Sequence, residues 1–455
     1  MIVSFSVANF RSFSSEETLS LVASNRLSTR HEDHAVPIPD STERVLRTAV
    51  LYGANGAGKS NLFKALRFLR TLAMRMRRKG SGTGRETFRF GEYSDQPTCF
   101  DLQFIVQERL YRFGVKIDDH KILEEWLVRV TGGRETVLYE RVTSEKGAVT
   151  IEVTGIVEAG PKLRALATVG GLQNQSFLAT LQATLDPAEY GDELRGILGW
   201  FSRGLTLIAP TQSFRSLGQV LAKDPELLSF AGEFLKSAST GVDHLKILKK
   251  ELSEEELREM LPEAALADIL GRGREEESRV IPLDEGSELL IEPNGVNRYY
   301  RIRIQAAHDD DKGHQVPLEL SEESDGTRRL LHLIPALHRL QKSSGVFFID
   351  EIDRSLHPML VRAFLESFLK CCEGGHRQVI VTTHESSLLD QDLLRRDEIW
   401  FAEKDHTSAT KLYSLSDFRV RNDLEIRKHY LQGRFGAVPF LGALEQLAEQ
   451  KDSVA

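Results

Sequence analysis

Residues 53–60 read GANGAGKS, and this stretch decides the fold. The apolar run 45–52 before it predicts a buried strand, and the leucine and alanine spacing of residues 61–78 after it predicts a helix. A glycine-rich turn between a strand and a helix lets backbone N–H groups face phosphate oxygens, because no side chain stands in the way. Lys59 is then placed to reach the β and γ phosphates, and the Ser60 hydroxyl to bind Mg²⁺. A glycine-rich turn with an incidental lysine would not account for the flanking strand and helix.

A second apolar run ends in two acids. Residues 345–351 read GVFFIDE, which is typical of a buried parallel strand whose carboxyl end lies at the edge where open α/β sheets bind ligands. Asp350 is the expected Mg²⁺ ligand, and Glu351 is placed to polarise the attacking water. Taken alone, the pattern also fits a strand that ends in two solvated acids. The phosphate loop favours the catalytic interpretation.

Two further elements have weaker patterns. Residues 379–384 read VIVTTH, a buried-strand pattern that ends on His384, and this histidine is either structural or hydrogen-bonded to the γ-phosphate. Residues 320–329 read LSEESDGTRR and precede a helical apolar run. Ser324 and Gly326 would offer a hydroxyl and free N–H groups to a terminal phosphate, although Ser324 also fits a plain helix N-cap.

Length and composition limit the class of protein. The 455 residues are 41% hydrophobic and 28% charged, and this length predicts two lobes or one lobe with a large insertion. The net charge of −8 gives no global basic field, so nucleic acid could be contacted only through a local patch such as residues 75–79, RMRRK. That run also fits a solvated helix end. Three cysteines, the lack of a leader pattern and the lack of an apolar run of about 20 residues favour a cytoplasmic protein without membrane spans.

The order of the four elements resembles that of the ABC ATPases of the SMC, RecF and OLD kind. The resemblance implies that residues 53–60 are the Walker A motif and residues 346–350 the Walker B motif. It also implies that Glu351 is the catalytic glutamate, that His384 is the switch histidine, and that the cofactors are ATP and Mg²⁺. Catalysis would then depend on Lys59, Glu351 and His384, with Ser60 and Asp350 on the metal.

Other motifs of this family are less complete. Residues 324–327, SDGT, resemble a signature motif that keeps the serine and the second glycine but has Asp and Thr at the other positions. Residues 355–358 fall at the D-loop, and residues 9–13 are similar to the first strand of RecF and SMC heads, where an arginine, here Arg11, lies near the nucleotide. The Q-loop glutamine stays open between Gln103 and Gln107.

The resemblance implies an α/β fold, that of an ABC-type P-loop ATPase head. Such a head contains a mixed sheet flanked by helices and an antiparallel β lobe, and here we expect it to carry a helical insertion. Period-two alternation over residues 98–153 and helical stripes over residues 161–270 agree with it. We expect residues 1–155 to form the N-terminal part of the head, residues 156–280 the insertion, and residues 281–455 the C-terminal part and tail. The implied nucleotide contacts are Gly53, Asn55, Gly56, Gly58, Lys59, Ser60, Asn61, Arg11, Ser324 and Gly326.

Two segments, 323–328 (ESDGTR) and 430–439 (YLQGRFGAVP), make the chain similar to the stand-alone ATPases of bacterial phage-defence loci, of the RloA/AbiL-like and PARIS AriA-like kind. This implies an ATP hydrolase that acts as a homodimer or higher homo-oligomer, because the signature serine of one chain completes the ATP site of another. It also implies control of a separately encoded effector, a TOPRIM-like or RloB-like nuclease or toxin. The alternative is a RecF- or SMC-like DNA-repair ATPase that binds DNA directly.

Overall fold

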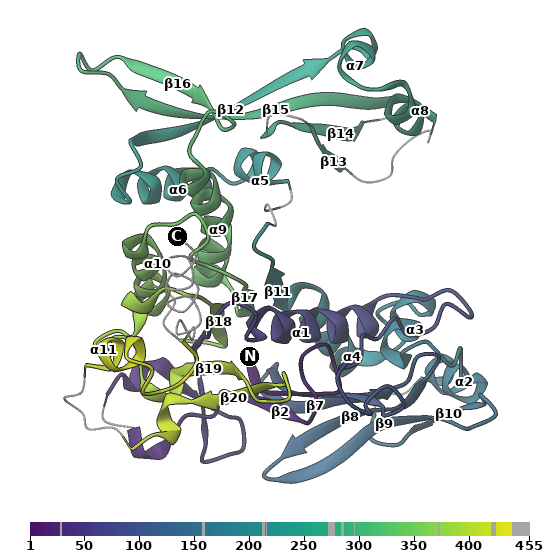
Figure 1. Cartoon of the computed structure of the whole chain (residues 1–455). Helices are drawn as coiled ribbons and strands as arrows, with labels where there is room; N and C mark the ends of the chain where they lie inside the picture. The colour runs from purple at the N-terminus through teal and green to yellow at the C-terminus, as the bar shows by residue number, and fades with distance from the viewer. Residues whose placement is uncertain are drawn as a thin grey trace, which may run out of the picture. The chain divides into compact units, whose positions relative to one another are not determined.

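The computed structural model describes the chain except residues 28–29, 157–159, 212–213, 215, 272–277, 284–285, 295, 372–373, 420–424 and 439–455. The last residue of the C-terminal motif, Pro439, and one of the three cysteines, Cys372, therefore lie outside the described residues. The chain folds as two compact units (Figure 1). Unit 1 comprises residues 1–210, 343–354 and 365–455, and unit 2 comprises residues 211–342 and 355–364.

Unit 1 contains a mixed sheet, of which the described residues form six strands. Its order is β11 (Leu205–Ile208), β17 (Gly345–Ile349), β18 (Arg377–Thr382), β5 (Thr48–Tyr52), β19 (Ile399–Lys404) and β20 (Thr410–Ser414). The strands from β11 to β19 are parallel, and β20 is antiparallel to β19. Every residue of β5 and β17 is buried, as expected for parallel strands covered on both faces. The predicted strand over residues 45–52 is divided between β4 (Arg44–Leu46), which pairs with β3 (Ala35–Pro37), and β5.

A second sheet in unit 1 is antiparallel throughout. It confirms the alternation predicted between residues 98 and 153, and it adds two strands from the start of the chain. The strand order is β10 (Val149–Val153), β9 (Arg134–Thr143), β8 (Ile122–Thr131), β7 (Arg109–Ile117), β6 (Thr98–Val106), β1 (Ile2–Ala8) and β2 (Glu17–Ser20).

Helix α1 (Lys59–Met74) packs against both sheets of unit 1 (Figure 1). The ring of Phe63 meets the edge of Phe348 in β17, with centroids 5.4 Å apart. Further along the helix, Phe68 stacks on Phe100 of β6 at 5.5 Å. The helix is shorter than predicted, because the backbone of Arg75 is extended (φ −120°, ψ 132°). The basic run 75–79 thus follows the helix and is not part of it.

Further helices cover unit 1. Those described are α2 (Pro161–Val169), α3 (Phe177–Thr184), α4 (Gly191–Gly199) with a π-helical turn over Trp200–Gly204, α11 (Ile426–Leu431) and short 3₁₀ turns. Helix α10 (Pro358–Cys371) supplies residues to both units. No helix in the described part of the chain is long and apolar enough to cross a membrane.

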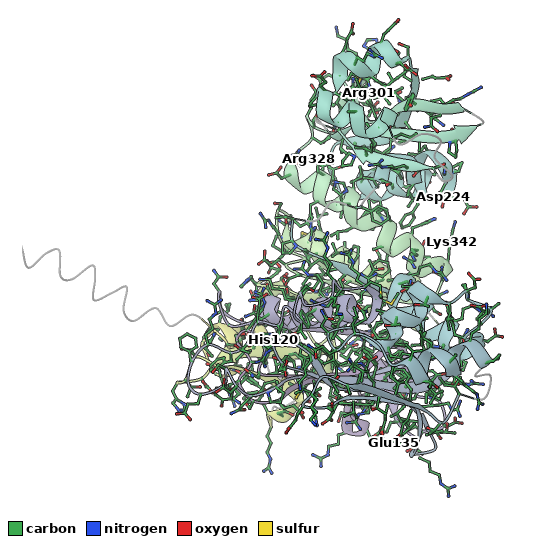
Figure 2. All side chains as sticks on the ribbon, turned by 90° about the vertical axis from the view of Figure 1, so that its right-hand side faces the viewer. His120, Glu135, Asp224, Arg301, Arg328 and Lys342 are labelled. Atoms are coloured by element: carbon green, nitrogen blue, oxygen red, sulfur yellow. The ribbon has the colours of Figure 1, made fainter. Side chains whose placement is uncertain are left out.

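Unit 2 combines an antiparallel sheet with helices. The described strands run in the order β12 (Val242–Leu252), β15 (Val296–Asp309), β14 (Glu288–Asn294) and β13 (Arg279–Pro282), and β16 (Gln315–Glu319) pairs with β15. The helices are α5 (Leu217–Lys223), α6 (Pro225–Ser237), α7 (Glu254–Met260), α8 (Glu263–Gly271) and α9 (Asp325–Lys342). Lys342 at the end of α9 pairs with Glu226 at 2.6 Å and lies 3.9 Å from Asp224, which caps α6 (Figure 2).

The α/β fold class predicted from the sequence is confirmed. The segment 156–280 is not wholly helical, because it also supplies β11 to the central sheet of unit 1 and β12 to the sheet of unit 2. These long-range strand pairings cannot be read from local periodicity. The compact units divide the chain at other residues than the predicted boundaries, 155 and 280. Compact units are not the same as domains, so the domain boundaries stay a prediction.

Candidate functional site

The phosphate loop connects β5 to α1 and needs glycine at its last turn. Gly58, the residue before α1, has a φ of 113°. A Cβ on this residue would lie 2.1 Å from Thr410 Oγ1 and 2.9 Å from Ser12 Oγ. Both the backbone angle and the close neighbours therefore exclude a side chain. Asn55 and Gly56, two of the expected nucleotide contacts, lie exposed at the tip of the loop.

Three polar side chains support this loop from the side of α1 and β20. Thr410 Oγ1 lies 2.8 Å from the carbonyl oxygen of Ala57 and 2.8 Å from Ser12 Oγ. Asn61, expected as a nucleotide contact, donates its side-chain amide to Ser12 Oγ at 2.8 Å. In this structure Asn61 holds the loop through Ser12. Thr410 has no motif around it, and only the fold brings it to the loop.

Lys59 is buried and occupies the concave side of the loop. Its Nζ donates to Gly53 O at 2.6 Å and to Ala54 O at 3.3 Å, and it lies 3.1 Å from Nε2 of His384. Burial lowers the pKa of Lys59 to about 8, although the nearby carboxylate of Asp353 opposes the shift. A lysine ammonium has only donors, so Nε2 of His384 accepts and its Nδ1 carries the proton. Burial and the charge of Lys59 lower the pKa of His384, which keeps the ring neutral.

Ser60 and Asp350, the two expected metal ligands, come together at the start of α1 and the end of β17. Ser60 Oγ donates to Asp350 Oδ1 at 3.1 Å. Adjacent oxygen ligands of an octahedral Mg²⁺ with bonds of about 2.0–2.1 Å lie about 2.9 Å apart. The observed separation therefore fits the pair to one Mg²⁺ ion, and both groups are oxygen donors, as that ion requires. Thr382 of β18 also donates to Asp350 Oδ1, at 2.7 Å.

Glu351 and Asp353 lie in the turn after β17. Glu351 has a left-handed backbone (φ 49°), and its N–H donates to Thr382 Oγ1 at 2.8 Å. Asp353 Oδ2 accepts the backbone N–H of His384 at 3.2 Å. Its other oxygen is buried and has no hydrogen-bond partner in the part of the chain that the structure describes. Neither Asp353 nor Thr382 was predicted from the sequence, although the spacing of the acids at 350, 351 and 353 was a usable signal for Asp353.

In the part of the chain that the structure describes, this cluster has no hydrogen bond or ion pair with Arg11, Gln103 or Gln107. Arg11 has a φ of 53° and forms an ion pair with Glu86 at 2.5 Å, so its expected proximity to the nucleotide stays a prediction. Gln107 lines a cavity with Gly345, the first residue of β17, and with His376, the residue before β18. These strands carry Asp350 and Thr382 at their other ends, so Gln107 lies at the opposite edge of the sheet. Gln103 lies within β6.

The Ser324 element belongs to unit 2 and is a helix start. Ser324 Oγ accepts the N–H of Thr327 at 3.1 Å, so this serine caps α9. A Cβ on Gly326 would lie 2.8 Å from the carbonyl oxygen of Ser355 in the expected D-loop. Arg328 pairs with Asp325 on the helix surface (Figure 2). The capping role is thus confirmed, and the role towards phosphate stays a prediction.

Comparison with known proteins gives the family. A family model described as "AAA domain, putative AbiEii toxin, Type IV TA system" matches residues 49–390. The chain belongs to this family. As an AAA-domain member it is an ATPase of the AAA type. No curated protein matches the chain.

Two solved structures are also similar to this AAA-domain protein. An SMC head domain from Thermotoga maritima is 12% identical with a TM-score of 0.38, over 91% of this chain and 98% of that one. An SMC head bound to the C-terminal winged-helix domain of ScpA is 13% identical with a TM-score of 0.39, over 91% and 97%.

We predict that Gly58→Ala in this AAA domain lowers the free energy of unfolding by about 2–4 kcal/mol, because it adds a left-handed backbone penalty to a clash with Thr410. Urea denaturation measures the change. Gly56→Ala is the matched control, since Gly56 has a φ of 79° but no atom within 4 Å of the place that a Cβ would occupy. In the control the free energy of unfolding should fall only by the penalty for a left-handed backbone, about 1–2 kcal/mol. Equal losses in the two variants would show that the contact with Thr410 is unimportant.

Proposed function

We propose that the protein hydrolyses ATP with Mg²⁺ and uses the nucleotide state as a switch in anti-phage defence. The observation that carries the ATPase part is the cluster at the carboxyl edge of the central sheet. There Lys59 and His384 lie 3.1 Å apart, and Ser60 contacts Asp350. Three separate segments of the chain supply these groups to one place.

Each side chain of this cluster would have a separate role in ATP binding or hydrolysis. Lys59 would leave the carbonyl oxygens of Gly53 and Ala54 and donate to the β and γ phosphates. Ser60 and Asp350 would hold Mg²⁺, and this ion would neutralise part of the negative charge of the phosphates. Glu351 would accept a proton from the attacking water. Once Lys59 turns to the phosphates, Nε2 of His384 would lose its present contact, and the tautomer with the proton on Nε2 would donate a hydrogen bond to the γ-phosphate.

Dimerisation is the second part of the proposal. The serine and N–H groups at the start of α9 suit a terminal phosphate, and the resemblance to ABC ATPases implies that they act on the nucleotide of a second chain. ATP would then hold two chains head to tail, and hydrolysis would release them. The family description names a putative toxin of a type IV toxin–antitoxin system, which supports an output that acts on the host cell. Control of a separately encoded effector rests on the resemblance to the phage-defence ATPases.

Phosphate release with and without Mg²⁺ tests the ATPase, and light scattering with and without ATP tests the dimer. Hydrolysis that needs Mg²⁺ and a mass that doubles with ATP would support both parts. Co-expression with the product of a neighbouring gene then tests the effector, by co-purification that depends on nucleotide. A chain that neither binds nor hydrolyses ATP would overturn the proposal.

A second function, direct DNA binding, is supported by the basic run 75–79. Arg75, Arg78 and Lys79 are exposed beyond the end of α1, whereas Arg77 is half-buried over the ring of Phe68. Binding to duplex DNA at several salt concentrations tests it. Replacement of the three exposed residues by alanine should lower the slope of log affinity against log salt by about 3 if each contacts one phosphate. An unchanged slope would exclude this surface.

A further inference from the structure

Thr382, at the end of β18, contacts both acids that follow β17. Its hydroxyl lies 2.7 Å from Asp350 Oδ1 and 2.8 Å from the backbone N of Glu351. The threonine is completely buried. No other hydroxyl in the described residues bridges this carboxylate and this amide. The contact is therefore a specific link between a neighbouring strand and the two acids.

The directions of the two hydrogen bonds follow from the chemistry of the groups. An ionised carboxylate only accepts, and a backbone N–H only donates. The single proton of the Thr382 hydroxyl must therefore point to Asp350, and its lone pair must accept from Glu351. The backbone carbonyl of Thr382 accepts a third bond, from the N–H of Ile352 at 3.1 Å. One residue thus fixes three successive positions of the turn.

Each of the two bonds has a separate consequence. The bond to Oδ1 fixes the rotation of the Asp350 carboxylate, and Oδ1 is the oxygen that Ser60 also contacts. The Thr382 proton uses one lone pair of Oδ1, and the other lone pair, which accepts from Ser60 here, is the one that a cation held together with Ser60 would use. The bond from the amide holds Glu351 at a φ of 49°, a conformation that costs a non-glycine residue free energy.

We propose that Thr382 is a positioning residue that orients Asp350 towards Mg²⁺ and holds Glu351 in its left-handed turn. This inference rests on the proposed ATPase function and adds a residue to it. Groups that hydrogen-bond a metal ligand from outside the coordination shell typically change metal affinity or activity by about 10- to 100-fold when they are removed. Thr382 is such a group for one acid and a backbone anchor for the next.

The test compares Thr382→Val, which keeps the shape and loses the hydroxyl, with Thr382→Ser, which keeps the hydroxyl. Thr383→Val is the matched control, because Thr383 is an equally buried neighbour whose hydroxyl accepts from Glu385 N–H and contacts neither acid. We expect Thr382→Val to weaken Mn²⁺ binding to the ATP-loaded protein by about 10- to 100-fold, measured by electron paramagnetic resonance, and to lower kcat similarly. Binding of a fluorescent ATP analogue without metal should change less than about threefold. Thr382→Ser and Thr383→Val should stay near wild type in all three measurements.

Wild-type Mn²⁺ affinity and kcat in Thr382→Val would overturn the inference, as would equal losses in Thr383→Val. If Thr382→Val does not fold, Thr382→Ala and Thr382→Ser give the same comparison, since they differ only in the hydroxyl, and equal behaviour of these two would contradict the proposal. The wild-type protein separates this result from the underlying function. A wild-type chain without Mg²⁺-dependent ATPase activity refutes the proposed function, whereas an active wild type with an unaffected Thr382→Val refutes only the role of Thr382.

Discussion

Lys59→Ala is expected to weaken ATP binding by about 100-fold or more, because the ammonium would donate charge-assisted hydrogen bonds to two phosphate groups. Each such bond contributes about 1.5–3 kcal/mol, and about 1.4 kcal/mol corresponds to a factor of ten in affinity. The lysine is the buried cation on the concave side of the loop and already lies against two loop carbonyl oxygens. Alanine leaves these oxygens with no replacement donor.

Calorimetric titration with ATP and Mg²⁺ measures this loss. Lys64→Ala is the matched control, because Lys64 lies on the same helix, five residues further, and is not part of the phosphate loop. It should bind ATP within about threefold of wild type. Circular dichroism checks that both variants keep the fold. Tight ATP binding by a folded Lys59→Ala protein would mean that the nucleotide binds elsewhere.

Much of this site was predictable, because its motifs are local. A phosphate loop needs glycines, a lysine and a serine at fixed spacing, and the loop lies between a strand and a helix as predicted. Ser60 was expected on Mg²⁺ from the phosphate-loop motif and Asp350 from its place at the carboxyl end of a buried strand, and the two side chains are in contact. His384 was expected to be either structural or bonded to the γ-phosphate, and its contact with Lys59 is a finding of the structure.

The supporting contacts were not predictable in this way. Thr410 reaches the loop from a strand far along the chain, and Thr382 reaches Asp350 because β18 lies next to β17. Neither residue belongs to a spaced motif, since a threonine at a strand end is common and its partner depends on strand order. The entry of β11 into the central sheet was missed for the same reason.

Glu351→Gln is expected to lower the rate of ATP hydrolysis by about 100-fold or more and to leave ATP affinity within about threefold. A positioned general base contributes about 10²–10⁴-fold, and glutamine cannot accept the proton of the attacking water. Binding should survive because Lys59, Ser60 and Asp350 are unchanged. If ATP holds two chains together, this variant should stay dimeric in ATP, since the reaction that releases the chains is blocked.

Phosphate release and light scattering in ATP measure the two effects of Glu351→Gln separately. Glu403→Gln is the matched control, because Glu403 is an exposed acid of β19 in the same sheet and its carboxylate bonds the hydroxyl of Tyr413. It should hydrolyse ATP within about twofold of wild type and show the same dimer lifetime. Wild-type turnover in Glu351→Gln would remove Glu351 from the reaction. A variant that no longer hydrolyses ATP but does not stay dimeric would support the catalytic role of Glu351. It would refute the proposal that hydrolysis releases the two chains, because that proposal requires an ATP-bound dimer to persist when hydrolysis is blocked.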